Sequence, residues 1–273
     1  DFKKFIADTN PDLTEDEVIQ IYDNVRLVGA ESDFATLHKV YGWMVNGVQF
    51  TTQDGLPRMI PLIDFDNWDK NIFRVVNQFT VEYTNNGQKE NRRPDVLLFV
   101  NGMPLCVIEL KNPADANATI YDAWEQINIR YWRDIPHLLH YCPLACISDG
   151  VKTRLGTVRT PYEHFYAWRR VNEGDAVSTL PFAETETMIK GVYAPERFME
   201  IFRDYIYFQD SIYDSDEVEI ICRYPQFFAA KLLKQSIVNS VVTRSGKGGT
   251  YFGATGCGKT YTMAFLARQL ALR

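Results

Sequence analysis

The sequence has 273 residues, which is enough for one large domain or two smaller ones. Hydrophobic residues make up 46% and charged residues 23%, which excludes a wholly disordered chain and predicts a sizeable packed core. The formal net charge of −6 does not favour a nucleic-acid binder, so contacts with phosphates must depend on local clusters of basic side chains.

Cysteine usage and hydropathy indicate the compartment. The five cysteines form no C-x-x-C pair, and their odd number does not indicate a disulfide framework, so reduced thiols in a cytoplasmic protein are expected. No apolar run reaches the roughly 18 residues of a membrane helix, so no membrane partner is expected. The chain begins at Asp1 and stops at Arg273 inside an expected helix, and we interpret it as a fragment.

The first 150 residues predict an α/β domain with a mixed central sheet. Thr14 and Glu17 form a capping-box pattern at the start of an expected helix. Residues 85–93 are polar and predict a turn. The strand–strand–helix–strand order of the second half is typical of an α/β core. Helices are expected over 14–25, 33–45 and 117–133, and strands over 72–84, 95–100, 104–111 and 141–148.

The rest of the chain predicts a linker and then the start of a second domain. Residues 171–191 are polar and poorly periodic, as in a linker. Helical patterns follow at 195–208 and 225–240, and a short strand at 250–252 precedes a glycine-rich loop and a helix from Lys259. The predicted organisation is a first domain at 1–175, a linker with connecting helices at 176–220, and a truncated second domain at 221–273.

The stretch RRPDVLLFVNGMPLCVIELK carries a candidate phosphodiesterase site. Asp95 and Glu109 are separated by a strand turn, and two such carboxylates suit a Mg²⁺ ion, which prefers hard oxygen ligands. Lys111 would lie near the attacking water or the developing charge. The alternative is an ordinary hairpin with surface charges, which the strongly apolar residues before Glu109 disfavour.

The register of this hairpin decides whether the two carboxylates can meet. Strand alternation puts Glu109 and Lys111 on one face. A plain two-residue turn at Asn101-Gly102 would send Asp95 to the opposite face, whereas a three-residue loop or a bulge would return it. The site therefore requires the longer loop or a bulge.

A second motif, GATGCGKT at 253–260, matches the phosphate-binding loop G-x-x-x-x-G-K-[ST] at every fixed position. Gly256 and Gly258 would let backbone amides curl around phosphates at a helix N-terminus. Lys259 would reach the β- and γ-phosphates of ATP, and Thr260 the Mg²⁺ ion.

Several lesser features are open to both structural and functional interpretations. Basic side chains near the candidate site could contact DNA phosphates or form a solvated surface. His137 and His140 lack a third ligand and are interpreted as structural. Three tryptophans are interpreted as core rather than as a base-stacking platform. The basic candidates are Lys89, Arg92, Arg93, Arg130, Arg133, Lys152, Arg154, Arg159, Arg169 and Arg170, and the tryptophans are Trp124, Trp132 and Trp168.

The segments NRRPDVLLFVNGMPLCVIELKNP, AWEQINIRYWRDIPHL, CISDG, TRLGT, RYPQFF and GATGCGKT occur in the order seen in type I restriction R subunits, which the chain resembles over most of 60–273. The resemblance implies a PD-(D/E)xK endonuclease domain followed by the beginning of a RecA-like motor, with Mg²⁺ and ATP as cofactors. It implies double-stranded DNA and the methylation and specificity subunits as partners. It also implies that Gln226, just upstream of the motor, reads the adenine edge, although a helix-capping role is the alternative.

One departure from the family pattern concerns the helix after Lys111. The family carries Q-x-x-x-Y there, whereas Gln126 and Tyr131 are five residues apart, about 140° round an α-helix instead of about 40°. Either the helix has a local bulge, or only one of the two residues keeps its role. The leading interpretation is an ATP-dependent restriction endonuclease fragment with weak or no activity alone. The alternatives are an ATP-regulated DNA-binding or assembly module with an inactive nuclease fold, and a repair helicase–nuclease fusion.

Overall fold

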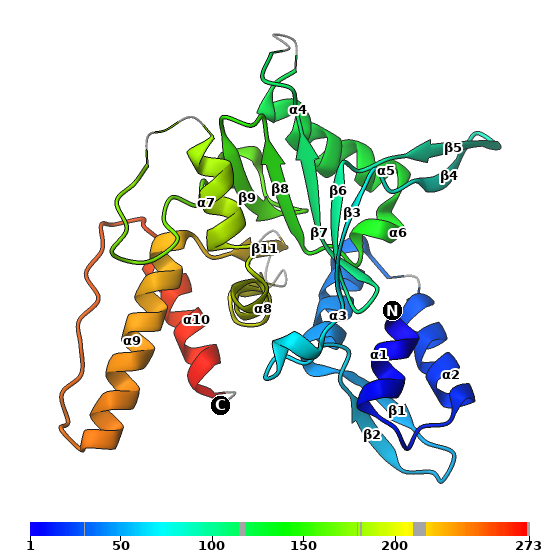
Figure 1. Cartoon of the computed structure of the whole chain (residues 1–273), viewed down its shortest axis with the longest axis horizontal. Helices are drawn as coiled ribbons and strands as arrows, with labels where there is room; N and C mark the ends of the chain where they lie inside the picture. The colour runs from blue at the N-terminus through cyan, green and yellow to red at the C-terminus, as the bar shows by residue number, and fades with distance from the viewer. Residues whose placement is uncertain (30, 115–117, 179, 181, 210–216, 272–273) are drawn as a thin grey trace.

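A five-stranded mixed sheet forms the centre of the molecule (Figure 1). The computed structural model describes residues 1–273 except 30, 115–117, 179, 181, 210–216 and 272–273. The strand order is β3-β6-β7-β8-β9, in which only the β7–β8 pair is parallel. This arrangement confirms the predicted mixed α/β core. The bounds are β3 Phe73–Asn77, β6 Val96–Val100, β7 Met103–Leu110, β8 Leu144–Ser148 and β9 Thr153–Thr157.

The predicted strand at 72–84 is in fact two strands, and the predicted turn at 85–93 is confined to Asn86-Gly87. The chain breaks at Gln78, where φ is 54°, and separates β3 from β4 (Val81–Asn85). Most of the expected turn is a strand, β5 (Gln88–Arg92), which pairs with β4 in a hairpin of its own. Polar strands of this kind are not predicted from hydropathy, because neither of their faces has to be apolar.

The β6–β7 hairpin shows which of the two predicted irregularities, a longer loop or a bulge, sets the register of its strands. The turn is the tight one, with Val100 opposite Met103 and positive φ angles at Asn101 and Gly102, so the longer loop is wrong. The alternative, a bulge, is confirmed, because the register shifts by one residue between Leu98 and Phe99. Val96 therefore lies opposite Ile108, and the shift turns the preceding residue toward the Glu109 face.

Helices and a small hairpin at the N-terminus pack beside the sheet. The Thr14 hydroxyl accepts from the Glu17 amide, and the Glu17 carboxylate accepts from the Thr14 amide, so the predicted capping box is confirmed. Both predicted helices form, and the β1–β2 hairpin was not predicted. The elements are α1 Phe2–Thr9, α2 Glu15–Arg26, α3 Asp33–Asn46, β1 Val48–Thr51, β2 Pro57–Ile60 and the 3₁₀ turn η1 Trp68–Lys70.

The helical segment after β7 is continuous but irregular. It begins at Ile120, three residues after the predicted start, and its middle is a π-helix, η2 (Gln126–Tyr131). Trp124 and Trp132 of this segment are half-buried, and their indole N–H groups donate to the Thr160 and Val158 carbonyls. The other elements are α4 Ile120–Glu125, α5 Trp132–Asp134, α6 Pro136–Leu139 and the 3₁₀ turn η3 Tyr162–His164.

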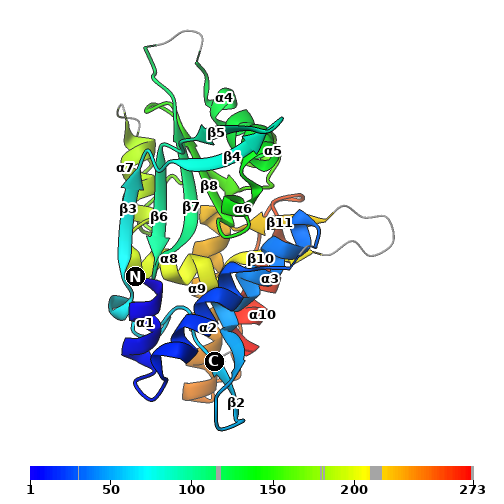
Figure 2. The same ribbon diagram turned by 90° about the vertical axis from the view of Figure 1, so that its right-hand side faces the viewer.

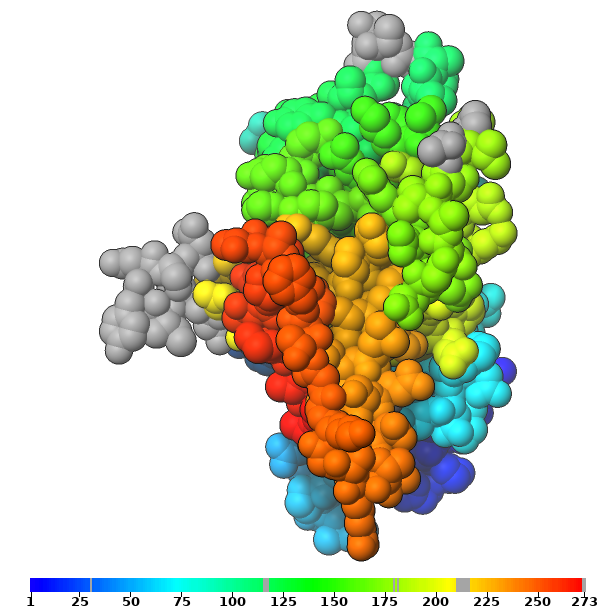
Figure 3. Space-filling model, turned by 90° about the vertical axis from the view of Figure 1, so that its left-hand side faces the viewer, coloured from blue at the N-terminus to red at the C-terminus, as the bar shows by residue number. Residues whose placement is uncertain are grey.

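The C-terminal third is mainly helical, and its last two helices, α9 and α10, lie side by side (Figure 1). Figure 3 shows this last part of the chain, in orange and red, on one face. The expected linker contains helix α7, the helix expected over 195–208 ends at Asp204 and continues as strand β10, and the short strand expected at 250–252 is not formed. A shared core joins Leu155 of the sheet to Phe227 and Phe265 of the last helices. The bounds are α7 Ala183–Gly191, α8 Pro195–Asp204, β10 Ile206–Gln209, β11 Val218–Ile221, α9 Tyr224–Thr243 and α10 Lys259–Ala271.

Candidate functional site

Glu109 and Asp95 lie together at one end of the sheet. Glu109 is fully buried near the end of β7, and its Oε1 atom accepts from the Asp95 amide at 3.3 Å. The Asp95 carboxylate accepts from the Leu110 amide at 2.9 Å and from the Gln78 side chain at 2.7 Å. The bulge thus brings the two carboxylates to one place, as the candidate metal site requires.

The π-helix explains the unusual five-residue spacing. In a π-helix hydrogen bonds join residues five apart, so such residues lie on one face. The Gln126 Nε2 atom donates to the Tyr131 hydroxyl at 2.8 Å and to Glu109 Oε2 at 2.8 Å, while the Tyr131 hydroxyl donates to Glu109 Oε1 at 2.5 Å. The local bulge is therefore present, and both side chains contact the same carboxylate.

Lys111 completes this network from the same face as Glu109. Its ammonium donates to Gln126 Oε1 at 2.7 Å, and its backbone amide donates to the Ser148 carbonyl of the neighbouring strand at 2.7 Å. The Gln126 side-chain amide therefore links the Lys111 ammonium to the Glu109 carboxylate. All five residues expected at this site converge, and Gln78 joins them without any sequence signal, because its left-handed backbone is set by the break between β3 and β4.

Burial dominates the electrostatics of Glu109. Desolvation raises the pKa of Glu109 to about 8, and the neighbouring Asp95 carboxylate adds to the increase, while the Tyr131 hydroxyl opposes it. Burial, together with the Glu109 charge, also raises the pKa of the Tyr131 hydroxyl, which stays a hydrogen-bond donor at neutral pH. The site thus holds a carboxyl group whose negative charge is costly until a cation is close.

The raised pKa predicts a pH-dependent stability difference for Glu109→Gln. The unfolded carboxyl ionises near 4.5 and the folded one near 8, so the native state holds the extra proton between these values and stability falls as pH rises. In EDTA, Glu109→Gln should match the parent at pH 4 and gain up to about 5 kcal/mol above pH 8. Urea denaturation at both pH values measures this. An equal difference at the two pH values would contradict the assignment.

The donor set suits a hard divalent cation. Within the part of the chain that the structure describes, no group of three or more Asp, Glu, His or Cys side chains could hold a metal. Two adjacent carboxylates are nevertheless the donors Mg²⁺ commonly uses, because it keeps several waters and takes further oxygens from a substrate phosphate. Glu109 Oε2 accepts one hydrogen bond, from Gln126, which leaves it free to take a further partner.

The glycine-rich loop adopts a compact turn before α10. Gly256 and Gly258 have φ angles of 79° and 82°, which favour glycine. The Lys259 ammonium donates to the Gly253 and Ala254 carbonyls at 2.8 and 2.9 Å, and Gln226 Nε2 donates to the Gly258 carbonyl at 3.0 Å. The loop is therefore closed by its own lysine and bonded to the glutamine expected to read adenine.

A hollow of about 620 Å³ adjoins this loop. Thr260 lines it with Lys259, and strand β10 contributes Tyr207 and Gln209, two residues that no sequence motif marks. Gln226 also accepts from the Arg223 amide at 2.8 Å, so it caps α9 as well as contacting the loop. The capping role of Gln226 is therefore confirmed, and its role toward adenine stays a prediction.

The basic candidates divide into engaged and exposed side chains. Arg92 and Arg133 both pair with Asp134, and Arg130 pairs with Glu125. Such pairs lower the availability of these cations for phosphates. The exposed side chains include Lys89, Arg93, Lys152 and Arg169.

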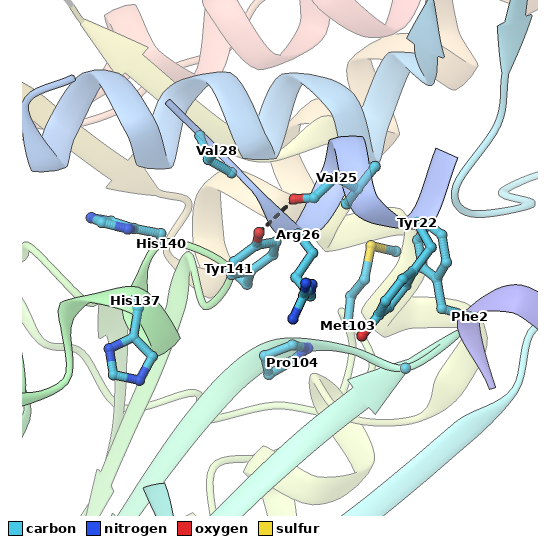
Figure 4. Close-up of a pocket in the computed structure, with 11 residues that line it drawn as sticks. Phe2, Tyr22, Val25, Arg26, Val28, Met103, Pro104, His137, His140 and Tyr141 are labelled. Atoms are coloured by element: carbon cyan, nitrogen blue, oxygen red, sulfur yellow. Dashed lines mark hydrogen bonds between the residues drawn. The ribbon is translucent and has the colours of Figure 1, made fainter. Parts of the chain in front are cut away.

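The two histidines lie at a pocket of about 350 Å³ between α2, the β6–β7 turn and α6 (Figure 4). His140 contacts Asp33 Oδ1 at 2.8 Å, and burial lowers the pKa of His137. No metal-binding group includes them within the described residues. Of the tryptophans, Trp168 is 1% exposed and lies in the shared C-terminal core.

No helix among the described residues is both long and apolar enough to cross a membrane. Residues 1–164 match the family model described as the N terminus of the type I restriction enzyme R protein. The putative type I restriction enzyme MjaIXP endonuclease subunit of Methanocaldococcus jannaschii is 30% identical over 292 residues, covering 98% of this chain and 27% of the relative.

Two bacterial relatives give the same picture. The HindI endonuclease subunit of Haemophilus influenzae is 30% identical, covering 98% of this chain and 25% of its own length. The SauCOLORF180P endonuclease subunit of Staphylococcus aureus is 27% identical, covering 77% of this chain and 20% of its own length. The chain thus spans about a quarter of the length of these relatives or less. On the family model and the relatives together, the chain belongs to the type I restriction enzyme R proteins and corresponds to their N-terminal region.

Proposed function

We propose that residues 1–175 form a PD-(D/E)xK endonuclease domain that hydrolyses DNA phosphodiester bonds with Mg²⁺. The observation that supports it best is the single hydrogen-bonded network of Asp95, Glu109, Lys111, Gln126 and Tyr131. A bulge and a π-helix are both needed to build this network, and such irregularities are over-represented at functional sites.

Each residue then has a role that follows from its contacts. Asp95 and Glu109 would hold the Mg²⁺ ion, which when bound polarises the phosphate and lowers the pKa of a bound water. Lys111 would orient the attacking water or offset charge developing on the phosphate. Gln126, which contacts both Glu109 and Lys111, fixes the distance between them. Tyr131 holds one oxygen of Glu109 and Gln126 holds the other, so the orientation of this carboxylate is fixed.

Residues 221–273 are proposed as the beginning of a RecA-like ATP-binding motor, with 176–220 as the connection. The glycine-rich loop supports this by its sequence match and by the helix that follows it. ATP would replace the Gly253 and Ala254 carbonyls as the partner of Lys259, with Thr260 directed to Mg²⁺ and Gln226 to the adenine. In the full-length protein this motor would drive translocation along double-stranded DNA.

The experiment that tests this proposal is reconstitution of the full-length protein with its methylation and specificity subunits. We expect cleavage of unmodified circular DNA that requires both ATP and Mg²⁺, and little or no cleavage by this chain alone. ATP hydrolysis without cleavage would support an assembly module with an inactive nuclease fold. Cleavage at DNA ends without the other subunits would support a repair helicase–nuclease fusion.

A further inference from the structure

The β4–β5 hairpin projects from the molecule beside the candidate nuclease site. Figures 1 and 2 show it extending past the helices at the same end of the sheet as α4. Each strand has five residues, so the hairpin is about 16 Å long. Its last strand ends at Arg92, three residues before Asp95.

One face of this hairpin is anchored to the domain. The Arg92 guanidinium donates to Asp134 of α5 at 2.7 Å and lies 5.1 Å from the centre of the Tyr83 ring. The Tyr83 hydroxyl donates to Glu90 at 2.5 Å, and the Asn85 amide donates to the other Glu90 oxygen at 2.9 Å. The acidic charge of Glu90 is therefore held on the anchored face.

The opposite face is entirely exposed and contains no apolar side chain. Because side chains alternate along a strand, Thr84 and Lys89 form one cross-strand pair on this face, and Glu82 and Asn91 form the next. Lys89 forms no ion pair with any described residue, and Arg93, the residue after β5, is also exposed. The turn at Asn86-Gly87 has φ angles of 49° and 80°, typical of a tight hairpin turn that keeps the two strands in register.

We infer that this exposed face lies against the DNA, in or beside its major groove, while the nearby phosphodiester is cut. The inference rests on the proposed nuclease function. A two-stranded ribbon fits the major groove, and Lys, Thr and Asn side chains are common partners of phosphates and base edges. Glu82 is the acidic residue of this face, and a glutamate in the major groove can accept from the amino group of cytosine. A protein partner is disfavoured, since protein interfaces have an apolar or aromatic centre, and this face offers none.

The geometry also limits where the contact falls. Three extended residues span at most about 10 Å, so even the hairpin tip lies within one turn of DNA, about 34 Å, of the bond cut at Asp95. The hairpin would thus hold the duplex at the nuclease site. It would not contribute to recognition of the distant target sequence.

Photocrosslinking in the reconstituted full-length complex tests the inference directly. The photoreactive residue p-benzoylphenylalanine is placed at Lys89 in a Glu109→Gln background, with ATP and unmodified DNA. The matched control places it at Gln53, in the turn of the exposed β1–β2 hairpin at the other end of the molecule. We expect crosslinks to DNA from position 89 and none from position 53. Crosslinks from position 89 to a protein subunit, or none to DNA, would overturn the inference.

Cleavage assays on substituted complexes distinguish failure of this inference from failure of the proposed nuclease function. Lys89→Ala should slow cleavage roughly threefold to tenfold and reduce its salt dependence, because one phosphate contact is lost, while ATP hydrolysis is unchanged. Lys89→Arg should restore cleavage, and Lys70→Ala, at an exposed lysine of η1, is the matched control. Full cleavage by Lys89→Ala would overturn the hairpin contact alone. If the unaltered complex does not cleave, the nuclease function and this inference both fail.

Discussion

Glu109→Gln is expected to abolish DNA cleavage by the reconstituted complex, with a loss of at least about 10³-fold, while ATP hydrolysis and translocation continue. The physical reason is the loss of one of the two adjacent carboxylates that would hold the metal. The amide keeps the size of the side chain and can still accept from Tyr131, so the fold is retained. Cleavage of unmodified circular DNA and ATP hydrolysis should be measured on the same preparation.

The matched control is Glu125→Gln. Glu125 lies beside Gln126 in sequence, but its carboxylate pairs with Arg130 and does not contact the site. We expect this variant to cleave as the parent does. Unaltered cleavage by Glu109→Gln would rule out the metal site and favour an inactive nuclease fold. Loss of cleavage in both variants would indicate that the effect is not specific to the candidate metal site.

Lys259→Ala is the second substitution with a large expected effect. Removal of the ammonium should abolish ATP hydrolysis, by about 10³-fold or more, and with it ATP-dependent cleavage. The nuclease residues are untouched, so the Glu109-dependent change of stability with pH should persist in this variant. Binding of a fluorescent ATP analogue, ATP hydrolysis and cleavage of circular DNA measure the three consequences.

Lys247→Ala provides the control, because Lys247 is an exposed lysine between α9 and α10 and lies outside the glycine-rich loop. Its ATP hydrolysis should equal that of the parent. Normal ATP hydrolysis by Lys259→Ala would refute the assignment of the loop. Continued ATP-dependent cleavage by this variant would instead separate the nuclease from the proposed motor.

The sequence by itself determined the features that follow from local chemistry. The capping box at Thr14, the apolar strand before Glu109 and the helix after the glycine-rich loop all depend on residues close together in the chain. The same holds for the identity of Asp95, Glu109 and Lys111 as candidates, because their spacing on two adjacent strands is a local pattern. Local patterns failed for the polar β5 strand, where no alternation of hydropathy marks the fold.

Only the tertiary structure decided how the candidates meet. The tight turn at Asn101-Gly102 alone would have separated Asp95 from Glu109, and the bulge after Leu98 reversed that outcome. The π-helix did the same for Gln126 and Tyr131, whose five-residue spacing fails on an α-helix. In both cases one extra residue changes the direction of every side chain beyond it. Whether that residue is absorbed as a bulge depends on packing against the rest of the sheet, which no local segment of the sequence contains.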